Sequence, residues 1–428
     1  MHPFSCCTLT SFQDSSISTL GSIKETSAEF SEQLSQDISV VLRQTVSILG
    51  NRKTKESFMA LRETHAQKLL DLLQDLLDLP CDSTFRPLLS KALVRLSKAS
   101  GLHPTCFRLS GLEKEGEQVG GGGYGDIWKG AVEGRCVAVK AMRIFRDGDV
   151  KDALRGFGRE AAVWRQLSHP NLLPFLGLYF LDTRLCLVSP WMEDGDLVGY
   201  LKRASADLDR IGLILDVAMG LEYLHSASVS VIHGDLKGTN ILVTPSRRAC
   251  IADFGLSSIV NEMSISSNHS TTNSAMGTIR WLAPEIIVGK SRHFASDIYA
   301  LGCVCYEILT GALPFKDMTD VAIIFAVVSN NLARPARPIP WPETDAYSAT
   351  WVLLERCWTQ EAHSRPTAAE IVRTLVSCPI EAKVKSGTDW DEAYSSRFRR
   401  SVRQSPLLLT ASEIESAIFR DVLQCPST

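Results

Sequence analysis

The sequence predicts an α+β fold in two lobes, preceded by a small all-α segment. Short β-like runs separated by glycines begin at Glu113, whereas the long elements after about Asp207 have helical patterns. Strands first and helices later is typical of layouts in which the two kinds of element are segregated. Before residue 110, apolar residues recur at spacings of three and four, which indicates helices.

The N-terminal part divides into two stretches. Residues 1–30 are rich in Ser and Thr, lack periodicity and predict a disordered lead-in. Residues 31–110 predict a helical region whose longest helix runs from about Lys55 to Leu79 and ends at Pro80. Its apolar stripe comprises Phe58, Leu61, Leu69, Leu72, Leu73, Leu76 and Leu77. A small bundle is the simpler interpretation, and a docking surface for a partner protein is the alternative.

Composition excludes several classes of protein. A net charge of -3 over 428 residues gives no general attraction to nucleic acid. A secretory signal is not expected, and no run approaches the roughly 18–20 consecutive apolar residues that span a bilayer. Its 12 cysteines include no C-x-x-C pair, so a zinc site is not expected and reduced, buried thiols are. A cytoplasmic protein is therefore predicted.

A glycine run supplies the first candidate for phosphate binding. Gly120, Gly122 and Gly125 form a G-x-G-x-x-G pattern, in which the missing side chains let backbone N–H groups approach phosphate oxygens. A flexible turn or a dinucleotide-binding fold would give the same letters. The residues that follow, from Ile127 to Lys140, alternate as strand, turn and strand, which favours a glycine-rich hairpin over a strand–helix unit.

Lys140 ends the apolar strand that begins at Val137, fifteen residues after Gly125. Most lysines at strand ends simply reach solvent. A hairpin, however, would set this one under the glycine run, where its ammonium can neutralise phosphate oxygens. Glu160, on an expected helix twenty residues later, is the candidate anion that holds it.

The most informative stretch runs from His233 to Asn240 and is followed by Asp253, Phe254 and Gly255. Asp235 is expected to orient or accept the proton of a substrate hydroxyl, and Lys237 to offset charge on a γ-phosphate. Asn240 and Asp253 are the candidate ligands of Mg²⁺, which prefers oxygen. Asp-Phe-Gly alone would be an ordinary turn, but it follows two strand-like runs.

Together these motifs resemble the eukaryotic protein kinase family over residues 113–379. Ala283-Pro284-Glu285 adds to the match, and Asp297 and Arg365 fall where the family has an anchor for the catalytic loop and a partner for Glu285. The resemblance implies ATP in a cleft beside a hinge at 187–192, with Ser189 at its gatekeeper position. The nucleotide-binding residues it implies are Gly120, Gly122, Gly125, Ile127, Ala138, Lys140, Ser189, Trp191 and Met192.

Subtype follows from finer resemblances. Lys237-Gly238-Thr239 and residues 277–285 resemble the tyrosine-kinase-like group of Ser/Thr kinases. The local sequence around His233 is similar to that of kinases of mushroom-forming fungi. One departure is Gly234, where the family usually has an Arg that binds a phosphorylated segment. Arg280 and Arg159 are the nearest substitutes.

An active Ser/Thr protein kinase using ATP and Mg²⁺ is therefore the leading hypothesis, with catalytic residues Asp235, Lys237, Lys140 and Glu160. A pseudokinase scaffold is the alternative, and a small-molecule kinase is a weaker one. All catalytic candidates follow Gly120, so the helical region is not expected to be needed for chemistry. Residues 380–428 predict a C-terminal tail with a short helix over 407–423.

Overall fold

The computed structural model describes residues 39–78, 85–122, 125–141, 161–181, 184–205, 207–226, 229–254, 258–259, 278–329, 334–339, 344–377, 388–391 and 394–402. The chain divides into two compact units. Of the described residues, 39–58 belong to the first unit and 59–402 to the second. The expected lead-in over 1–30 and the expected helix over 407–423 lie outside the described residues.

The expected helix from Lys55 to Leu79 is two helices, α2 (Arg52–Ala60) and α3 (Glu63–Asp78). At the break the Arg62 guanidinium donates to the carbonyls of Met59 and Leu61 at 3.1 and 2.7 Å. Glu63 then takes a left-handed φ of 50°, which a continuous helix excludes.

Helix α4 (Arg86–Ser100) follows α3 within the second unit. Gly101 forms the C-cap of α4: its φ is 72°, and its N–H donates to the Ser97 carbonyl at 2.8 Å. The apolar stripes of α3 and α4 are buried inside this unit, with Leu70, Leu73 and Leu93 at 0% exposure. A bundle-like packing of these two helices is therefore what the stripes build.

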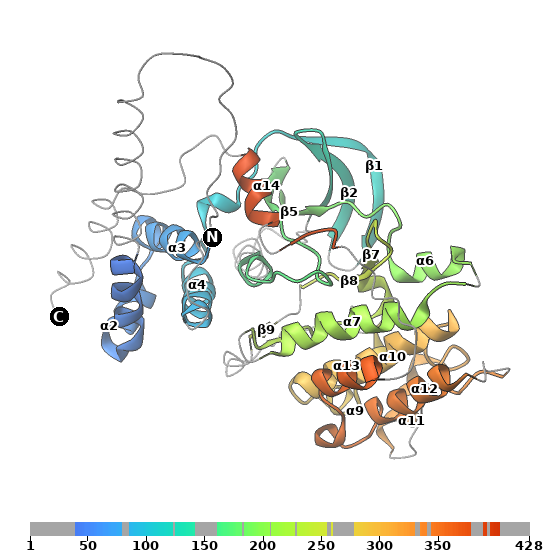
Figure 1. Ribbon diagram of the computed structural model, residues 1–428. Coiled ribbons are helices and arrows are strands. Elements are labelled where there is room, and N and C mark those ends of the chain that lie inside the picture. The colour runs from blue at the N-terminus through green and yellow to red at the C-terminus, as the bar shows by residue number, and fades with distance from the viewer. Residues whose placement is uncertain are drawn as a thin grey trace, which may run out of the picture. The chain divides into compact units, whose positions relative to one another are not determined.

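A five-stranded antiparallel sheet forms the first lobe of the α+β part, with strand order β1-β2-β3-β5-β4 (Figure 1). Its strands are β1 (Leu112–Gly122), β2 (Gly125–Val132), β3 (Arg135–Ala141), β4 (Gly177–Leu181) and β5 (Arg184–Pro190). A short 3₁₀ turn, η1 (Thr105–Phe107), precedes the sheet. Segregated strands and helices confirm the two-lobed α+β prediction.

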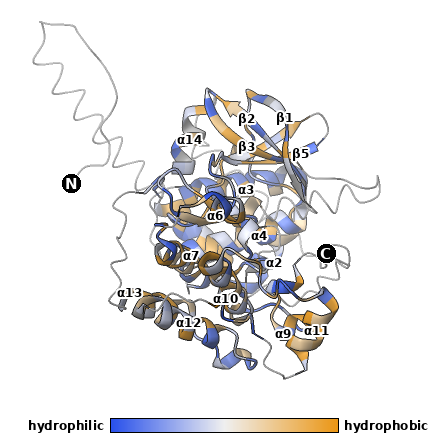
Figure 2. Cartoon of the chain, turned by 90° about the vertical axis from the view of Figure 1, so that its right-hand side faces the viewer, coloured by the Kyte–Doolittle hydropathy of each residue, from blue (hydrophilic) through white to orange (hydrophobic). Residues whose placement is uncertain are grey.

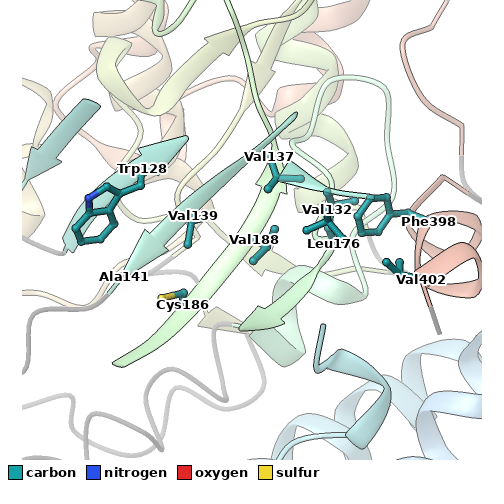
Figure 3. Close-up of a cluster of buried hydrophobic side chains, with 10 residues drawn as sticks. All are labelled: Trp128, Val132, Val137, Val139, Ala141, Leu176, Cys186, Val188, Phe398 and Val402. Carbon is teal, nitrogen blue, oxygen red and sulfur yellow. The ribbon is translucent and has the colours of Figure 1, made fainter. Parts of the chain in front are cut away.

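The register gives the sheet two different faces. Side chains alternate between the two faces along a strand. Trp128, Val139 and Val188 are cross-strand neighbours and therefore share one face, whereas Ile127 and Lys140 share the other. The first face is a buried apolar cluster (Figure 3). Its members are Trp128, Val132, Val137, Val139, Ala141, Leu176, Cys186, Val188, Phe398 and Val402.

Helix α14 (Tyr394–Val402) covers part of that apolar face. Figure 3 shows Phe398 and Val402 beside Val132 and Leu176, on the side of the cluster away from Trp128. This helix was not predicted from the sequence. The only helix expected in the C-terminal tail was at 407–423. With its first face covered in this way, the opposite face of the sheet is left to line the site.

The second lobe is mainly helical. Its helices are α6 (Leu197–Arg203), α7 (Arg210–His225), α9 (Pro284–Ile287), α10 (Phe294–Thr310), α11 (Asp320–Val328), α12 (Asp345–Cys357) and α13 (Ala368–Ser377). Helix α10 is buried over fourteen of its residues and forms the centre of the lobe. Figure 2 shows apolar colouring on α11, where Val321 and Phe325 are 63% and 71% exposed.

Two short two-stranded sheets flank the loops that matter most for chemistry. Strand β7 (Ile241–Val243) pairs with β8 (Ala249–Ile251), which confirms the two strand-like runs expected before Asp253. Strand β6 (Val231–Ile232), just before His233, pairs with β9 (Ser258–Ile259), which follows β8 in the chain. In the part of the chain described, no helix is both long and apolar enough to cross a membrane.

Candidate active site

The glycine run is the tip of the β1–β2 hairpin. Gly120 lies opposite Ile127 and Gly122 opposite Gly125, so the chain turns back on itself instead of entering a helix. The expected hairpin is confirmed, and the dinucleotide-fold alternative is wrong. Across the next pair of strands Ile127 lies opposite Lys140, which places Lys140 beneath the hairpin as expected.

The hinge lies at the end of β5. Ala138 is the cross-strand partner of Ser189, whose side chain is buried at 6% exposure, on the same face of the sheet as Lys140. Beyond the strand, the Met192 carbonyl accepts from the Gly195 N–H at 3.1 Å, and the Trp191 N–H donates to the Cys136 carbonyl at 3.4 Å. These backbone bonds fix the connection between the two lobes.

Lys140 meets the expected metal ligand directly. Its Nζ donates to Asp253 Oδ1 at 2.6 Å, and the two side chains are 17% and 28% exposed. Glu160, its expected partner, lies outside the described residues. Asp253 has a φ of 61°, a left-handed conformation that costs energy for a residue with a Cβ and that clusters at functional sites. The turn after β8 therefore holds this carboxylate in a strained position facing the lysine.

Asp235 is held by two neighbours on one oxygen. Its Oδ2 accepts from Lys237 Nζ at 2.8 Å and from Asn240 Nδ2 at 3.0 Å. The Asn240 amide also donates to the Asp235 carbonyl at 2.7 Å, so its Oδ1 is the atom left to accept or to ligate. Lys237 Nζ donates in addition to Thr278 Oγ1 at 3.1 Å. The loop thus joins the expected base, lysine and amide in one network, with Thr278 as a further member.

His233 and Asp297 hold the backbone of this loop. The Asp235 N–H donates to His233 Nδ1 at 3.2 Å, so His233 Nε2 carries the proton and donates to the Ala252 carbonyl at 3.1 Å. Asp297, 2% exposed, accepts from the N–H groups of His233 and Gly234 at 2.8 and 2.9 Å. Asp297 is therefore the loop anchor that the motifs implied.

The pKa of Asp297 lies below its usual value. Burial alone would raise this pKa, but the hydrogen bond and charge of His225, at 3.0 Å, and the bond from Gly234 outweigh it. The carboxylate stays charged, and a charged acceptor makes the stronger hydrogen bonds. The catalytic loop is consequently tied firmly to the start of α10.

Glu307 is a second anchor that the sequence analysis missed. Its Oε2 accepts from the Gly238 N–H at 3.0 Å and from Trp281 Nε1 at 2.8 Å. Burial raises its pKa from 4.5 to about 7, and these two hydrogen bonds only partly oppose that rise. A Cβ at Gly238 would lie 2.8 Å from Oε1, so glycine is needed there. A Glu in an apolar helix was the available signal.

The Glu285–Arg365 pair expected from the motifs is confirmed. Arg365 donates from two nitrogens to the two carboxylate oxygens at 2.7 and 2.8 Å, and its side chain is 0% exposed. Burial would raise the pKa of Glu285, but the bonds and charge of Arg365 hold it below its usual value. This pair fastens α9 to the turn that precedes α13.

The cation near Gly234, where the family usually has an arginine, is not one of the two that the sequence suggested. Arg280 donates to the carbonyls of Pro314, Phe315 and Met318, so its guanidinium is already engaged. Arg159 lies outside the described residues. The cation beside the loop is instead Arg292, whose Nε donates to the Gly234 carbonyl at 3.0 Å. Both residues line a small cavity between the catalytic loop and the start of α10.

The donor set fits a hard cation that shares its ligands with a phosphate. Asn240 offers Oδ1, and Asp253 offers a carboxylate on the turn that follows β8. Among the described residues no group of three or more His, Cys, Asp or Glu side chains could hold a metal alone. Mg²⁺ commonly binds through one or two carboxylate or amide oxygens plus phosphate and water.

Taken together, the fold and the site define a phosphotransferase class. A glycine hairpin and a lysine form one side, and a loop with a carboxylate, a lysine and an amide forms the other. Comparison with known proteins agrees. Residues 114–375 match the family model described as protein tyrosine and serine/threonine kinase. The chain belongs to this family, as its motifs led us to expect.

Several curated relatives are similar over the same region. The serine/threonine/tyrosine-protein kinase HT1 of Arabidopsis thaliana is 34% identical over 61% of this chain and 65% of its own length. Human mitogen-activated protein kinase kinase kinase 11 is 33% identical over 63% of this chain and 31% of its own. A putative serine/threonine-protein kinase/receptor, R831, of Acanthamoeba polyphaga mimivirus is 32% identical, with 61% and 15% covered. The chain thus spans less than two thirds of each relative.

Proposed function

We propose that this chain is a protein kinase that transfers the γ-phosphoryl group of ATP to Ser or Thr hydroxyls of protein substrates. The observation that carries the proposal is the shared network of Asp235, Lys237 and Asn240, beside the Lys140–Asp253 pair. Phosphoryl transfer requires positioning and charge neutralisation more than covalent chemistry from the protein. Each of these side chains has a role in that task.

Asp235 orients the acceptor. Its Oδ2 is occupied by Lys237 and Asn240, so Oδ1 is the oxygen that accepts the hydroxyl proton. Lys237 and Lys140 carry the positive charge that offsets the phosphate oxygens. When bound, Mg²⁺ supplies further charge at those oxygens, and Asn240 and Asp253 are the residues that would hold it. The glycine hairpin covers the phosphates with backbone N–H groups.

The hinge and the sheet face accommodate the nucleoside. We propose that Ile127, Ala138 and Ser189 line the base, since the strand register places them on the face that α14 does not cover. Trp191 and Met192 follow directly in the hinge. Gly120, Gly122 and Gly125 lie in the hairpin above.

The Ser/Thr assignment rests on the contact between Lys237 and Thr278 at 3.1 Å. It joins two segments that resemble the tyrosine-kinase-like group of Ser/Thr kinases. We extend the proposal in three ways: the chain belongs to that group, the residues around His233 are similar to those of kinases of mushroom-forming fungi, and the kinase acts in intracellular signalling. Buried free thiols such as Cys303 and Cys305 support a reducing, cytoplasmic setting.

A pseudokinase scaffold remains the competing function. Gly234 motivates it, because an arginine that usually receives a regulatory phosphate is missing. Every described group needed for transfer is nevertheless present and connected, which favours an enzyme. A partner protein for the N-terminal helices would need another surface than the α3 stripe, since that stripe is buried.

The test is to identify the acceptor. Purified full-length protein is incubated with labelled ATP, Mg²⁺ and a peptide mixture containing Ser, Thr and Tyr, and the labelled residues are mapped. Label on Ser and Thr supports the proposal. Label on Tyr alone would overturn the acceptor assignment, and nucleotide binding without any label would favour the scaffold.

A further inference from the structure

The segment that links the helical region to the kinase domain adds to the edge of the sheet. The Leu109 N–H donates to the Leu178 carbonyl in β4 at 2.7 Å, and Arg108 bridges the same residue in parallel. The two backbones approach closely at Gly177, where a Cβ would lie 2.6 Å from the Phe107 carbonyl and from Leu109 Cγ. The linker is therefore part of the lobe packing.

Helix α3 contacts the helical turn 161–165, which directly follows Glu160 in the sequence. Asp78 pairs with Arg165, and Gln166 Nε2 donates to Gln74 Oε1 at 2.9 Å. Gln74 is 0% exposed, and the side chains of Arg165 and Asp78 are 7% and 19% exposed, so the contact is largely shielded from water. Removing one partner of a largely buried ion pair is destabilising, so this pair restrains the turn against α3.

A column of aromatic rings continues from the linker into the site. Phe107 lies 5.4 Å from Phe175 between ring centroids, Phe175 lies 5.5 Å from Trp164, and Trp164 lies 5.5 Å from Phe254. Phe254 is 5.6 Å from His233. These distances fall within the range of favourable ring contacts. All five rings are between 0% and 4% exposed, so the column is dry along its length.

The last two rings of the column, Phe254 and His233, adjoin the expected metal ligand and the expected base. Phe254 follows Asp253 in the chain, and the His233 ring accepts from the Asp235 N–H at 3.2 Å. The other nitrogen of that ring donates to the Ala252 carbonyl at 3.1 Å. A displacement of Phe254 or His233 would therefore shift both the expected metal ligand and the expected base.

We propose that the N-terminal linker and α3 are positioning elements of the active site. Phe107 is the ring at the linker end of the column. Asp78 holds the turn that contains Trp164, the middle ring of the column. Together they keep Asp253 and Asp235 in register for transfer. The inference rests on the proposed kinase activity, and it reverses the expectation that residues before Gly120 are not needed for chemistry.

Phe107→Ala in the full-length chain is the main test, and Phe58→Ala is its matched control. Both rings are buried, at 0% and 1% exposure, but Phe58 lies in α2 and outside the column. We expect Phe107→Ala to lower kcat by about 10–100-fold, the scale reported for small misplacements of reacting groups. KM for ATP should change little, because the column does not line the nucleotide. Phe107→Leu should restore part of kcat.

Hydrogen exchange provides a readout besides turnover. Peptides covering 161–176 and 231–236 should exchange faster in Phe107→Ala than in the wild type or in Phe58→Ala. Asp78→Asn, with the 67%-exposed Glu56→Gln as control, should have the same effect on exchange without opening a cavity. It serves if Phe107→Ala fails to fold.

Unchanged kcat and exchange in both Phe107→Ala and Asp78→Asn would overturn the inference. Equal losses in Phe107→Ala and Phe58→Ala would also overturn it, because they would indicate general destabilisation. A wild-type chain that transfers no phosphoryl group would instead overturn the proposed function. In that case the exchange comparison still decides whether the N-terminal elements hold the loops.

Discussion

Glu307→Gln should make the stability of this protein less dependent on pH. In the folded chain burial raises the pKa of Glu307 from 4.5 to about 7. A carboxyl group whose pKa is raised on folding stabilises the native state fully below 4.5, and this contribution is lost as the pH rises toward 7. The difference of about 2.5 pH units, at about 1.4 kcal/mol each, corresponds to about 3.5 kcal/mol.

Urea unfolding of the wild type and of Glu307→Gln at pH 4.5, 6 and 8 measures this contribution. The free energy of unfolding of the variant, minus that of the wild type, should increase by up to about 3.5 kcal/mol from pH 4.5 to pH 8. Gln suits the site because its carbonyl can still accept from Gly238 and Trp281. The 74%-exposed Glu361→Gln is the control and should show a flat difference. Parallel pH profiles for wild type and Glu307→Gln would refute the assignment of a buried, partly protonated carboxyl group.

Three further outcomes are expected. Lys140→Met should slow transfer by about 10²–10³-fold or more with an unchanged urea midpoint, and full kcat would contradict its role. Arg365→Met should destabilise the fold by about 3–5 kcal/mol, since it leaves the buried Glu285 without its two-point partner, and an unchanged midpoint would show the pair to be neutral. Asp253→Asn should raise the Mg²⁺ concentration needed for half-maximal rate, and an identical metal titration would remove it from the metal site.

The catalytic residues could be predicted because their chemistry depends on spacing within short segments. The hairpin at Gly120–Gly125, the loop from His233 and the turn at Asp253 are each local, so residue types and intervals are enough to place them. The Glu285–Arg365 pair is 80 residues apart and came only through the family resemblance. Its geometry could not be worked out from the sequence itself.

What the sequence did not predict depends on long-range packing. Glu307 looks like one polar residue in an apolar helix until α10 brings it to Gly238, 69 residues away. Phe398 and Val402 cover the sheet only because the chain returns to it near its end. The break between α2 and α3 lies at the left-handed φ of Glu63, which the apolar pattern alone does not signal.

The N-terminal helices illustrate the same limit. Their apolar stripe was readable, but whether it faces a partner or this chain depends on contacts such as Asp78 with Arg165. Two residues 87 positions apart leave no joint signal in a single sequence. Phe107 likewise looks like any apolar residue in the sequence, because its contact with Phe175 joins two distant segments.

The central claim is that Asp235 orients the acceptor for transfer from ATP. The most direct measurement is the single-turnover rate of γ-phosphoryl transfer to a Ser/Thr peptide by wild type and by Asp235→Asn, beside a titration of ATP binding to each. The account predicts a wild-type rate that falls by about 10²-fold or more in the variant, with ATP affinity unchanged. Equal rates in the two proteins, or a variant that loses ATP binding while keeping its rate, would contradict it.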